Sequence, residues 1–239
     1  MNTMNPSEPL RIGVLPLARP TFDVPYAEKT CKDAWKLMEN IPVNWIGSSD
    51  LLFDTKSVES QLSKFKKEHL DLLLILQMTF TDASMTVKLA ENFDVPLLFW
   101  SFPEKRTGGR LRLNSLCGVN LAAHALGKSG IQCDYLNLNP QAPETQDELA
   151  SWIRAFQTRK NLSSTKIAVI GEHPDGFHTC SFDSNKLMDI TGVTVKQIEL
   201  PELFNEADKI TIDTVVEARS QLDLQINGLD QVEQDPLEK

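Results

Sequence analysis

Polar and aromatic side chains stand directly after predicted strands in two segments of the chain. Arg19 lies in LARPTFD, and Phe80 precedes Asp82 by two positions in QMTFTDAS. A guanidinium and a carboxylate can hydrogen-bond to the hydroxyl groups of a sugar, while an aromatic ring can cover its apolar face. These residue types therefore indicate a binding site for a small polar ligand.

A third segment, residues 101–118, carries three arginines, among them Arg110, and the adjacent Gly108 and Gly109. It lacks the G-x-G-x-x-G and G-x-x-x-x-G-K patterns of nucleotide-binding loops. A nucleotide site that uses these glycines is therefore a weaker hypothesis than a sugar site.

Each of these residues also has a simpler interpretation. Asp82 can cap the following helix, Phe80 can pack on that helix, and Arg19 can pair with Asp23 on the surface. The argument for a site is their shared position, because ligands of open parallel sheets bind beyond the carboxyl ends of the strands.

The segment GEHPDGFHTC, residues 171–180, contains side chains that coordinate metals: Glu172, His173, Asp175, His178 and Cys180. Its spacing matches no tight metal motif, and Pro174, Asp175 and Gly176 are typical of a turn between a strand and a helix. We therefore assign no metal ligand in this chain. No G-x-S-x-G elbow or cysteine–histidine pair indicates a nucleophile, so no catalytic residue is assigned either.

The composition is that of a soluble globular protein, with 239 residues of which 41% are hydrophobic and 24% charged. The net charge of −9 disfavours nucleic acid and anionic membranes as partners, because both would repel an acidic chain. The sequence has no recognisable signal peptide or membrane-spanning run, and its four cysteines form no C-x-x-C pair. We expect a cytoplasmic protein.

Apolar runs and helical patterns alternate along the chain, which predicts the α/β class with mostly parallel sheets in two Rossmann-like αβα units. We expect strands at residues 11–17, 42–47, 71–77, 95–100, 132–138, 165–171 and 193–200. We expect helices at residues 26–39, 58–68, 83–92 and 120–128, around 152–156, near 184–190 and around 215–222. The predicted domains are residues 1–140, a linker and connecting helix at 141–164, and residues 165–239. The second unit, with two strand and helix sets, is expected to be incomplete.

Four segments together resemble the N-terminal part of the L-fucose isomerase and L-arabinose isomerase-like family. They are GVLPLARPTFDV, LQMTFTDASM, VPLLFWSFPEKRTGGRLRLNSLCGVNLAAHAL and IGEHPDGFHTCSFD, and the likeness runs from about Arg11 to about Leu222. The resemblance implies enzymes that interconvert an aldose and a ketose with a divalent metal, usually manganese. It also implies assembly as homo-oligomers, trimers or hexamers, with metal ligands that come from later in the chain.

The resemblance also implies roles for individual residues. Arg19 matches a position near the sugar, and Phe80 matches an aromatic residue that covers the substrate across a subunit boundary. Asp82, in the same segment as Phe80, and Arg110, in the third segment, complete the predicted substrate-binding set, although the third segment is not matched to the family position by position. The expected ligand is a small sugar of the pentose or 6-deoxyhexose type, and manganese is expected for the complete enzyme rather than for this chain alone.

Two functions stay open at this point. The chain is either the N-terminal portion of a metal-dependent aldose–ketose isomerase, or a non-enzymatic sugar-binding or regulatory module without the catalytic domain. The first allows for a truncated piece or a split gene, and the second for a natural short form.

Overall fold

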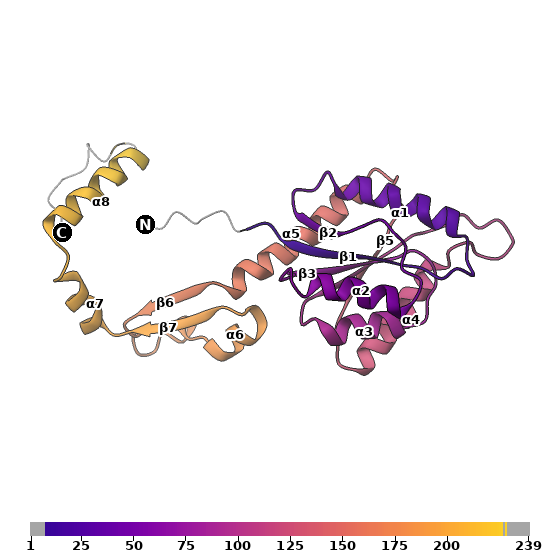
Figure 1. Cartoon of the computed structure of the whole chain (residues 1–239). Coiled ribbons are helices and arrows are strands. Elements are labelled where there is room, and N and C mark those ends of the chain that lie inside the picture. The colour runs from indigo at the N-terminus through magenta and orange to yellow at the C-terminus, as the bar shows by residue number, and fades with distance from the viewer. Residues whose placement is uncertain (1–7, 227, 229–239) are drawn as a thin grey trace. The chain divides into compact units, whose positions relative to one another are not determined.

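The computed structural model describes residues 8–226 and residue 228. The chain divides into two compact units between Asn161 and Leu162 (Figure 1). None of the described helices has the length and apolar character needed to cross a bilayer.

The first unit contains one parallel sheet of five strands in the order β2-β1-β3-β4-β5. Its strands are β1 (Arg11–Leu17), β2 (Asn44–Gly47), β3 (Leu72–Gln77), β4 (Leu97–Ser101) and β5 (Asp134–Asn137). Neighbouring strands are in register, with Ile12 opposite Leu72 and Ile75 opposite Phe99. Strands β3 and β4 are buried along their whole length, as expected for strands covered on both faces.

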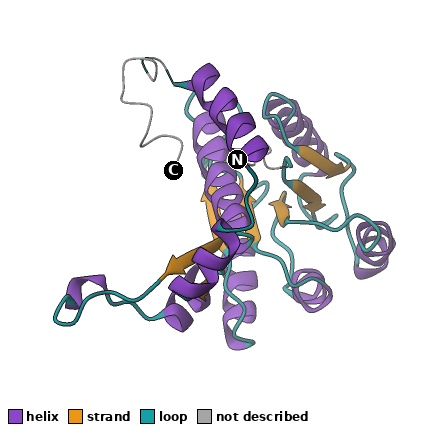
Figure 2. Cartoon of the chain, turned by 90° about the vertical axis from the view of Figure 1, so that its left-hand side faces the viewer, coloured by secondary structure: helices purple, strands orange, loops and turns teal. Residues whose placement is uncertain are grey.

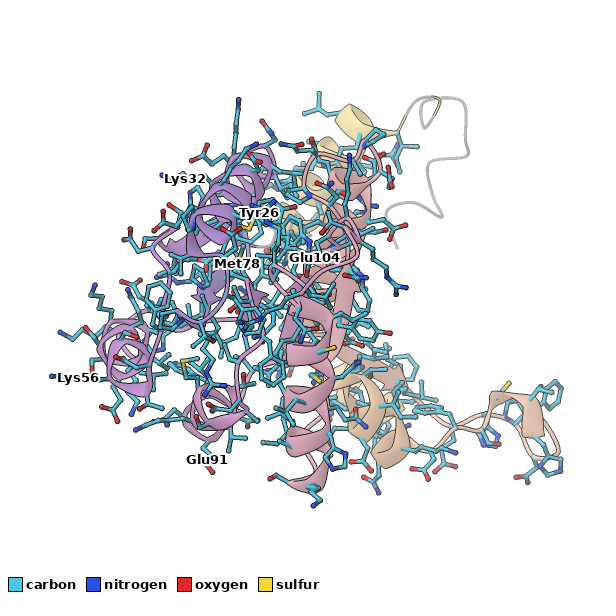
Figure 3. All side chains as sticks on the ribbon, turned by 90° about the vertical axis from the view of Figure 1, so that its right-hand side faces the viewer. Tyr26, Lys32, Lys56, Met78, Glu91 and Glu104 are labelled. Atoms are coloured by element: carbon cyan, nitrogen blue, oxygen red, sulfur yellow. The ribbon has the colours of Figure 1, made fainter. Side chains whose placement is uncertain are left out.

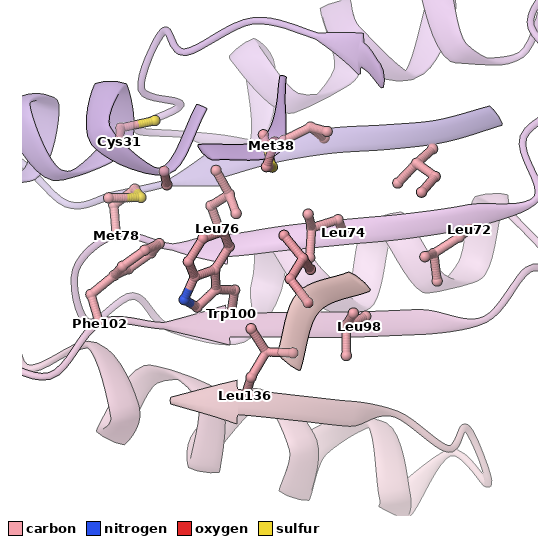
Figure 4. Packing of buried hydrophobic residues seen from close by; sticks show 14 of the residues in the cluster. Cys31, Met38, Leu72, Leu74, Leu76, Met78, Leu98, Trp100, Phe102 and Leu136 are labelled. Carbon is pink, nitrogen blue, oxygen red and sulfur yellow. The ribbon is translucent and has the colours of Figure 1, made fainter. Parts of the chain in front are cut away.

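Helices cover both faces of this sheet (Figures 1 and 2). Figure 2 draws the helices in purple and the strands in orange. The helices are α1 (Val24–Met38), α2 (Thr55–Phe65), α3 (Ser84–Asn92), α4 (Ser115–Lys128) and α5 (Thr145–Ser163). Helices α1 and α5 pack on one face, and α2, α3 and α4 pack on the other. In Figure 4, Cys31 and Met38 of α1 lie over Leu74, Leu76 and Trp100 of the sheet. The predicted α/β class with Rossmann-like αβα units is confirmed.

Helix α4 begins earlier than the predicted start at residue 120. Ser115, its first residue, accepts a hydrogen bond from the backbone N–H of Phe102 at 3.0 Å and donates one to the carbonyl oxygen of Gln77. These bonds tie the start of α4 to β3 and β4. The predicted left-handed glycine after the helix is present, because Gly130 has a φ of 73°.

The second unit contains a two-stranded parallel sheet of β6 (Lys166–Ile170) and β7 (Thr194–Ile198). Its helices are η1 (His178–Cys180), α6 (Ser184–Thr191), α7 (Leu200–Ala207) and α8 (Ile212–Gln225). Among the residues described in this unit, Val193 is the one buried hydrophobic side chain. Helix α7 was not predicted, because the sequence indicated one strand over residues 193–200. The helix instead starts at Leu200, with Pro201 in its first turn.

Candidate functional site

The order of the strands marks one place on the sheet where a ligand is expected. From β1 the chain moves first to β2 on one side and then to β3 on the other. In open parallel sheets, ligands bind outside the carboxyl ends of the strands where the winding direction changes. For this sheet, that point lies between the first loop (residues 18–23, after β1) and the second loop (residues 78–83, after β3).

Backbone hydrogen bonds tie these loops together and to the third loop (residues 102–114, after β4). The N–H of Arg19 donates to Oγ1 of Thr79 at 2.7 Å, which joins the first loop to the second. The N–H of Phe80 donates to the carbonyl oxygen of Leu113 at 2.8 Å, which joins the second loop to the third. The predicted site residues are therefore held by the backbone rather than carried on independent loops.

Arg112 connects the third loop to the first. Its Nε donates to Oδ2 of Asp23 at 2.8 Å, and its guanidinium carbon lies 3.9 Å from the centre of the Tyr26 ring. The hydrogen bond from Arg112, followed by one from the backbone N–H of Tyr26, lowers the pKa of Asp23 below its ordinary value. Asp23 is thus both the N-cap of α1 and the anionic partner of Arg112.

Phe22 lies next to two of the predicted residues, Phe80 and Arg110. Its ring centroid is 6.2 Å from that of Phe80, and the guanidinium carbon of Arg110 lies 4.9 Å from the Phe22 centroid. Both rings are half-buried, so one part of each is packed and another part faces solvent. Figure 3 views the first unit from this edge of the sheet, with Tyr26 and Glu104 labelled near the middle.

Arg19 pairs with Asp82, and the pairing with Asp23 considered from the sequence is wrong. Nη2 of Arg19 lies 3.8 Å from Oδ2 of Asp82, and both side chains are about half exposed. Asp82 also accepts hydrogen bonds from the hydroxyl and, at 3.1 Å, the backbone N–H of Ser84. These two bonds lower the pKa of Asp82, with a smaller contribution from Arg19. The interpretation of Asp82 as the N-cap of the following helix is wrong, because the N-cap position of α3 belongs to Ala83.

Glu104 closes the base of the third loop. Its carboxylate accepts the backbone N–H groups of Arg112 at 2.6 Å, Leu113 at 3.0 Å and Asn114 at 2.7 Å. Asn114, the N-cap residue of α4, has a left-handed φ of 52°. Residues 105–111 are exposed above this closure. The sequence interpretation missed Glu104, because a single glutamate eleven positions before a helix start carries no local pattern.

A buried polar network lies beneath the second loop. The side chain of Gln77 is fully buried, and its Nε2 donates to the carbonyl oxygen of Thr79 at 2.8 Å and to Oγ1 of Thr81 at 3.0 Å. Gly118 of α4 leaves room for this amide, because a Cβ at Gly118 would lie 2.8 Å from Gln77 Nε2. Gln77 therefore fixes the turn that presents Phe80. Sequence reasoning singled out neither Gln77 nor Gly118.

The acidic and histidine-containing segment of the second unit does not assemble a metal site. Residues 171–175 and 180–182 line a hollow of about 690 Å³ together with parts of β6 and β7. Among the described residues, no three His, Cys, Asp or Glu side chains are grouped so that they could hold a metal ion. The described residues thus do not fit a manganese ion, and we derive no step through one.

Comparison with known proteins gives a consistent result for the chain. Residues 13–163 match the family model described as "Fucose/sulfoquinovose isomerase, N-terminal domain". The chain belongs to the fucose/sulfoquinovose isomerase family. The resemblance found from the sequence is confirmed at this level.

Members of the fucose/sulfoquinovose isomerase family that resemble the chain carry the name sulfoquinovose isomerase. The protein of Priestia megaterium (strain ATCC 12872 / QMB1551) is 28% identical over 215 residues, which are 90% of this chain and 48% of that protein. The protein of Alkalicoccus urumqiensis is 30% identical over 201 residues, 84% of this chain and 45% of that protein. The protein of Clostridium sp. (strain MSTE9) is 27% identical over 222 residues, which are 92% of this chain and 49% of that protein. The chain spans about half the length of the curated relatives it matches.

Proposed function

We propose that the chain is the N-terminal portion of an aldose–ketose sugar isomerase, and that its three tied loops form a wall against which the sugar binds. The observation that carries the proposal is the gathering of Arg19, Phe80, Asp82 and Arg110 at the switch point of the sheet. Arg19 and Asp82 offer donors and acceptors to sugar hydroxyls, and Phe80 offers an apolar face. Membership of the family supports this function.

The proposed role of these loops is to bind and orient the sugar rather than to move its protons. No catalytic residue is assigned within this chain. Dependence on manganese, assembly as a trimer or hexamer and a cytoplasmic location remain predictions for the complete protein. Sulfoquinovose, named in the relatives, is a 6-deoxyhexose with a sulfonate on C6, and it falls within the expected class of pentose or 6-deoxyhexose sugars.

The substitution Phe80→Ala tests the wall. A sugar that covers about 50 Å² of the ring gains about 1 kcal/mol, so its removal raises the Michaelis constant roughly fivefold. The measurement uses protein purified at its native length from its native organism, with sulfoquinovose as substrate. Tyr135→Ala is the matched control, because Tyr135 is 57% exposed on the edge strand β5, away from the three loops. Equal Michaelis constants for Phe80→Ala and wild type would refute the wall.

A non-enzymatic sugar-binding module is the second candidate. It rests on the same loop residues, Arg19, Phe80, Asp82 and Arg110, which could contact a sugar without a metal ion. This candidate predicts saturable binding of a sugar without added metal and no interconversion of aldose and ketose by the native protein. Turnover by the native protein rules it out, and calorimetry without any binding heat does so as well.

A further inference from the structure

The three loops are basic although the chain as a whole is acidic. Together they carry five cationic side chains and three carboxylates, whereas the whole chain has 24 lysines and arginines and 33 aspartates and glutamates. The cations are Arg19, Lys105, Arg106, Arg110 and Arg112, and the carboxylates are Asp23, Asp82 and Glu104. The three loops taken together therefore have a local charge opposite to that of the molecule, which favours an anionic ligand.

All three carboxylates of the loops already have partners. Asp23 is bound to Arg112 at 2.8 Å, and Asp82 lies against Arg19 and Ser84. The carboxylate of Glu104 is occupied by the three backbone N–H groups at the base of the third loop. None of them pairs with Arg110, and no other carboxylate among the described residues does so.

Arg110 differs from the other unpaired cations of its loop because its guanidinium is held in place. It stacks over Phe22 at 4.9 Å, next to Phe80, whereas Lys105 and Arg106 make no such contact among the described residues. Stacking on a ring uses the face of the guanidinium and leaves the N–H groups along its edge free to donate. Those donors match the oxygen atoms of a sulfonate or phosphate, which accept two parallel hydrogen bonds.

We propose that Arg110, held over Phe22, binds the anionic substituent of the sugar whose ring lies against Phe80. This inference rests on the proposed sugar wall and adds the residue of this chain that contacts the sulfonate or phosphate oxyanion of such a sugar. Arg110 is then a specificity-determining residue. It strengthens binding of the charged sugar, while Phe80 contributes equally to charged and neutral sugars.

Calorimetry on the natively purified protein tests this with three ligands that share a glucose-type ring. Sulfoquinovose has a sulfonate at C6, quinovose has hydrogen there, and glucose 6-phosphate has a phosphate. The wild type should bind sulfoquinovose more tightly than quinovose by tenfold or more, since hydrogen bonds to a charged group contribute about 1.5–3 kcal/mol. Comparison of the two anionic sugars identifies the oxyanion that the site prefers. The sulfoquinovose preference should shrink as salt is raised.

The variant Arg110→Ala should bind sulfoquinovose at least tenfold more weakly than the wild type does. Its affinity for quinovose should stay within about twofold of the wild-type value. Arg106→Ala is the matched control, because it removes the same charge from the same exposed loop without a ring contact, and it should change either affinity less than about threefold. The inference would be overturned if Arg110→Ala weakened the binding of sulfoquinovose and quinovose equally. It would also be overturned if Arg106→Ala weakened sulfoquinovose binding as much as Arg110→Ala does. If the wild type binds all three sugars equally well, the inference fails and the sugar wall stands. If it binds none, the proposed function fails and the inference fails with it.

Discussion

The contact between Gly118 and Gln77 gives a prediction whose size follows from the structure. A Cβ added at Gly118 would lie 2.8 Å from Nε2 of Gln77 and 3.0 Å from its Cδ and Cγ atoms. Carbon atoms do not approach other atoms this closely, so Gly118→Ala must displace either the amide or helix α4. Displacement of the amide breaks its hydrogen bonds to Thr79 and Thr81 inside a fully buried site.

Two opposing effects set the magnitude. Alanine is favoured over glycine in a helix interior by about 1 kcal/mol. Overpacking costs about 1–3 kcal/mol, and each lost hydrogen bond of the network costs about 0.5–1.5 kcal/mol. With two hydrogen bonds lost, we therefore expect Gly118→Ala to lower the free energy of unfolding by about 1–5 kcal/mol. Gly127→Ala, on the same helix, should be neutral or stabilising by up to about 1 kcal/mol, because no described atom lies within 4 Å of its Cβ position.

Urea unfolding followed by tryptophan fluorescence is the suitable assay. All four tryptophans, Trp35, Trp45, Trp100 and Trp152, belong to the first unit, so the signal reports on that unit alone. In a Gln77→Ala background the added Cβ meets no amide, and Gly118→Ala should then cost nothing. Equal stability of Gly118→Ala and Gly127→Ala in the otherwise unchanged chain would refute the reasoning.

Three further predictions concern thiols, pH and the third loop. Burial raises the pKa of the Cys31 thiol to about 12, so Ellman's reagent at pH 8 should modify the exposed Cys117 and spare Cys31 until the chain unfolds; equal rates would contradict this. The pKa of Asp23 is lowered in the folded state, so its contribution to stability is present above the ordinary value of 3.8 and lost as the pH falls through the folded-state value. Asp23→Asn should therefore be less stable than wild type in urea at pH 7, with a difference that narrows below pH 3.8; a constant difference would disprove the linkage. Glu104→Ala releases the base of the third loop, and trypsin should cut residues 105–111 faster than in wild type; unchanged cleavage would show that Glu104 does not restrain the loop.

The central strands could be predicted from the sequence because burial on both faces leaves a continuous apolar run. Strand β1 (Arg11–Leu17) has the bounds expected from RIGVLPL, and β3 (Leu72–Gln77) differs from its prediction by one residue. The unpredicted helix α7 shows where such reasoning ends. Leu200 was expected to be the last residue of the strand that contains β7, but β7 ends at Ile198 and Leu200 is the first residue of α7. Local periodicity thus identifies an element more reliably than its boundary.

The three site loops could be predicted together because the carboxyl ends of parallel strands meet at one edge. Their pairings could not be predicted. The partner of Arg19 is Asp82, 63 positions away, rather than Asp23, and Arg112 pairs with Asp23 across 89 positions. Such contacts depend on the order of the strands in the sheet, which periodicity in one sequence does not specify.

The strand order also determines when the first unit can close as it emerges from the ribosome. Strand β1 is synthesised first. The core between the sheet and α1 is completed only by the side chains of Leu149, Ile153 and Phe156 from α5. At about 5–20 residues per second, this leaves an interval of roughly 10–30 s between the synthesis of β1 and that of its last covering helix. During that time α1 is the one described helix available to cover this face of the sheet. The core under α1 and α5 is thus completed only after all five strands of the sheet have been synthesised.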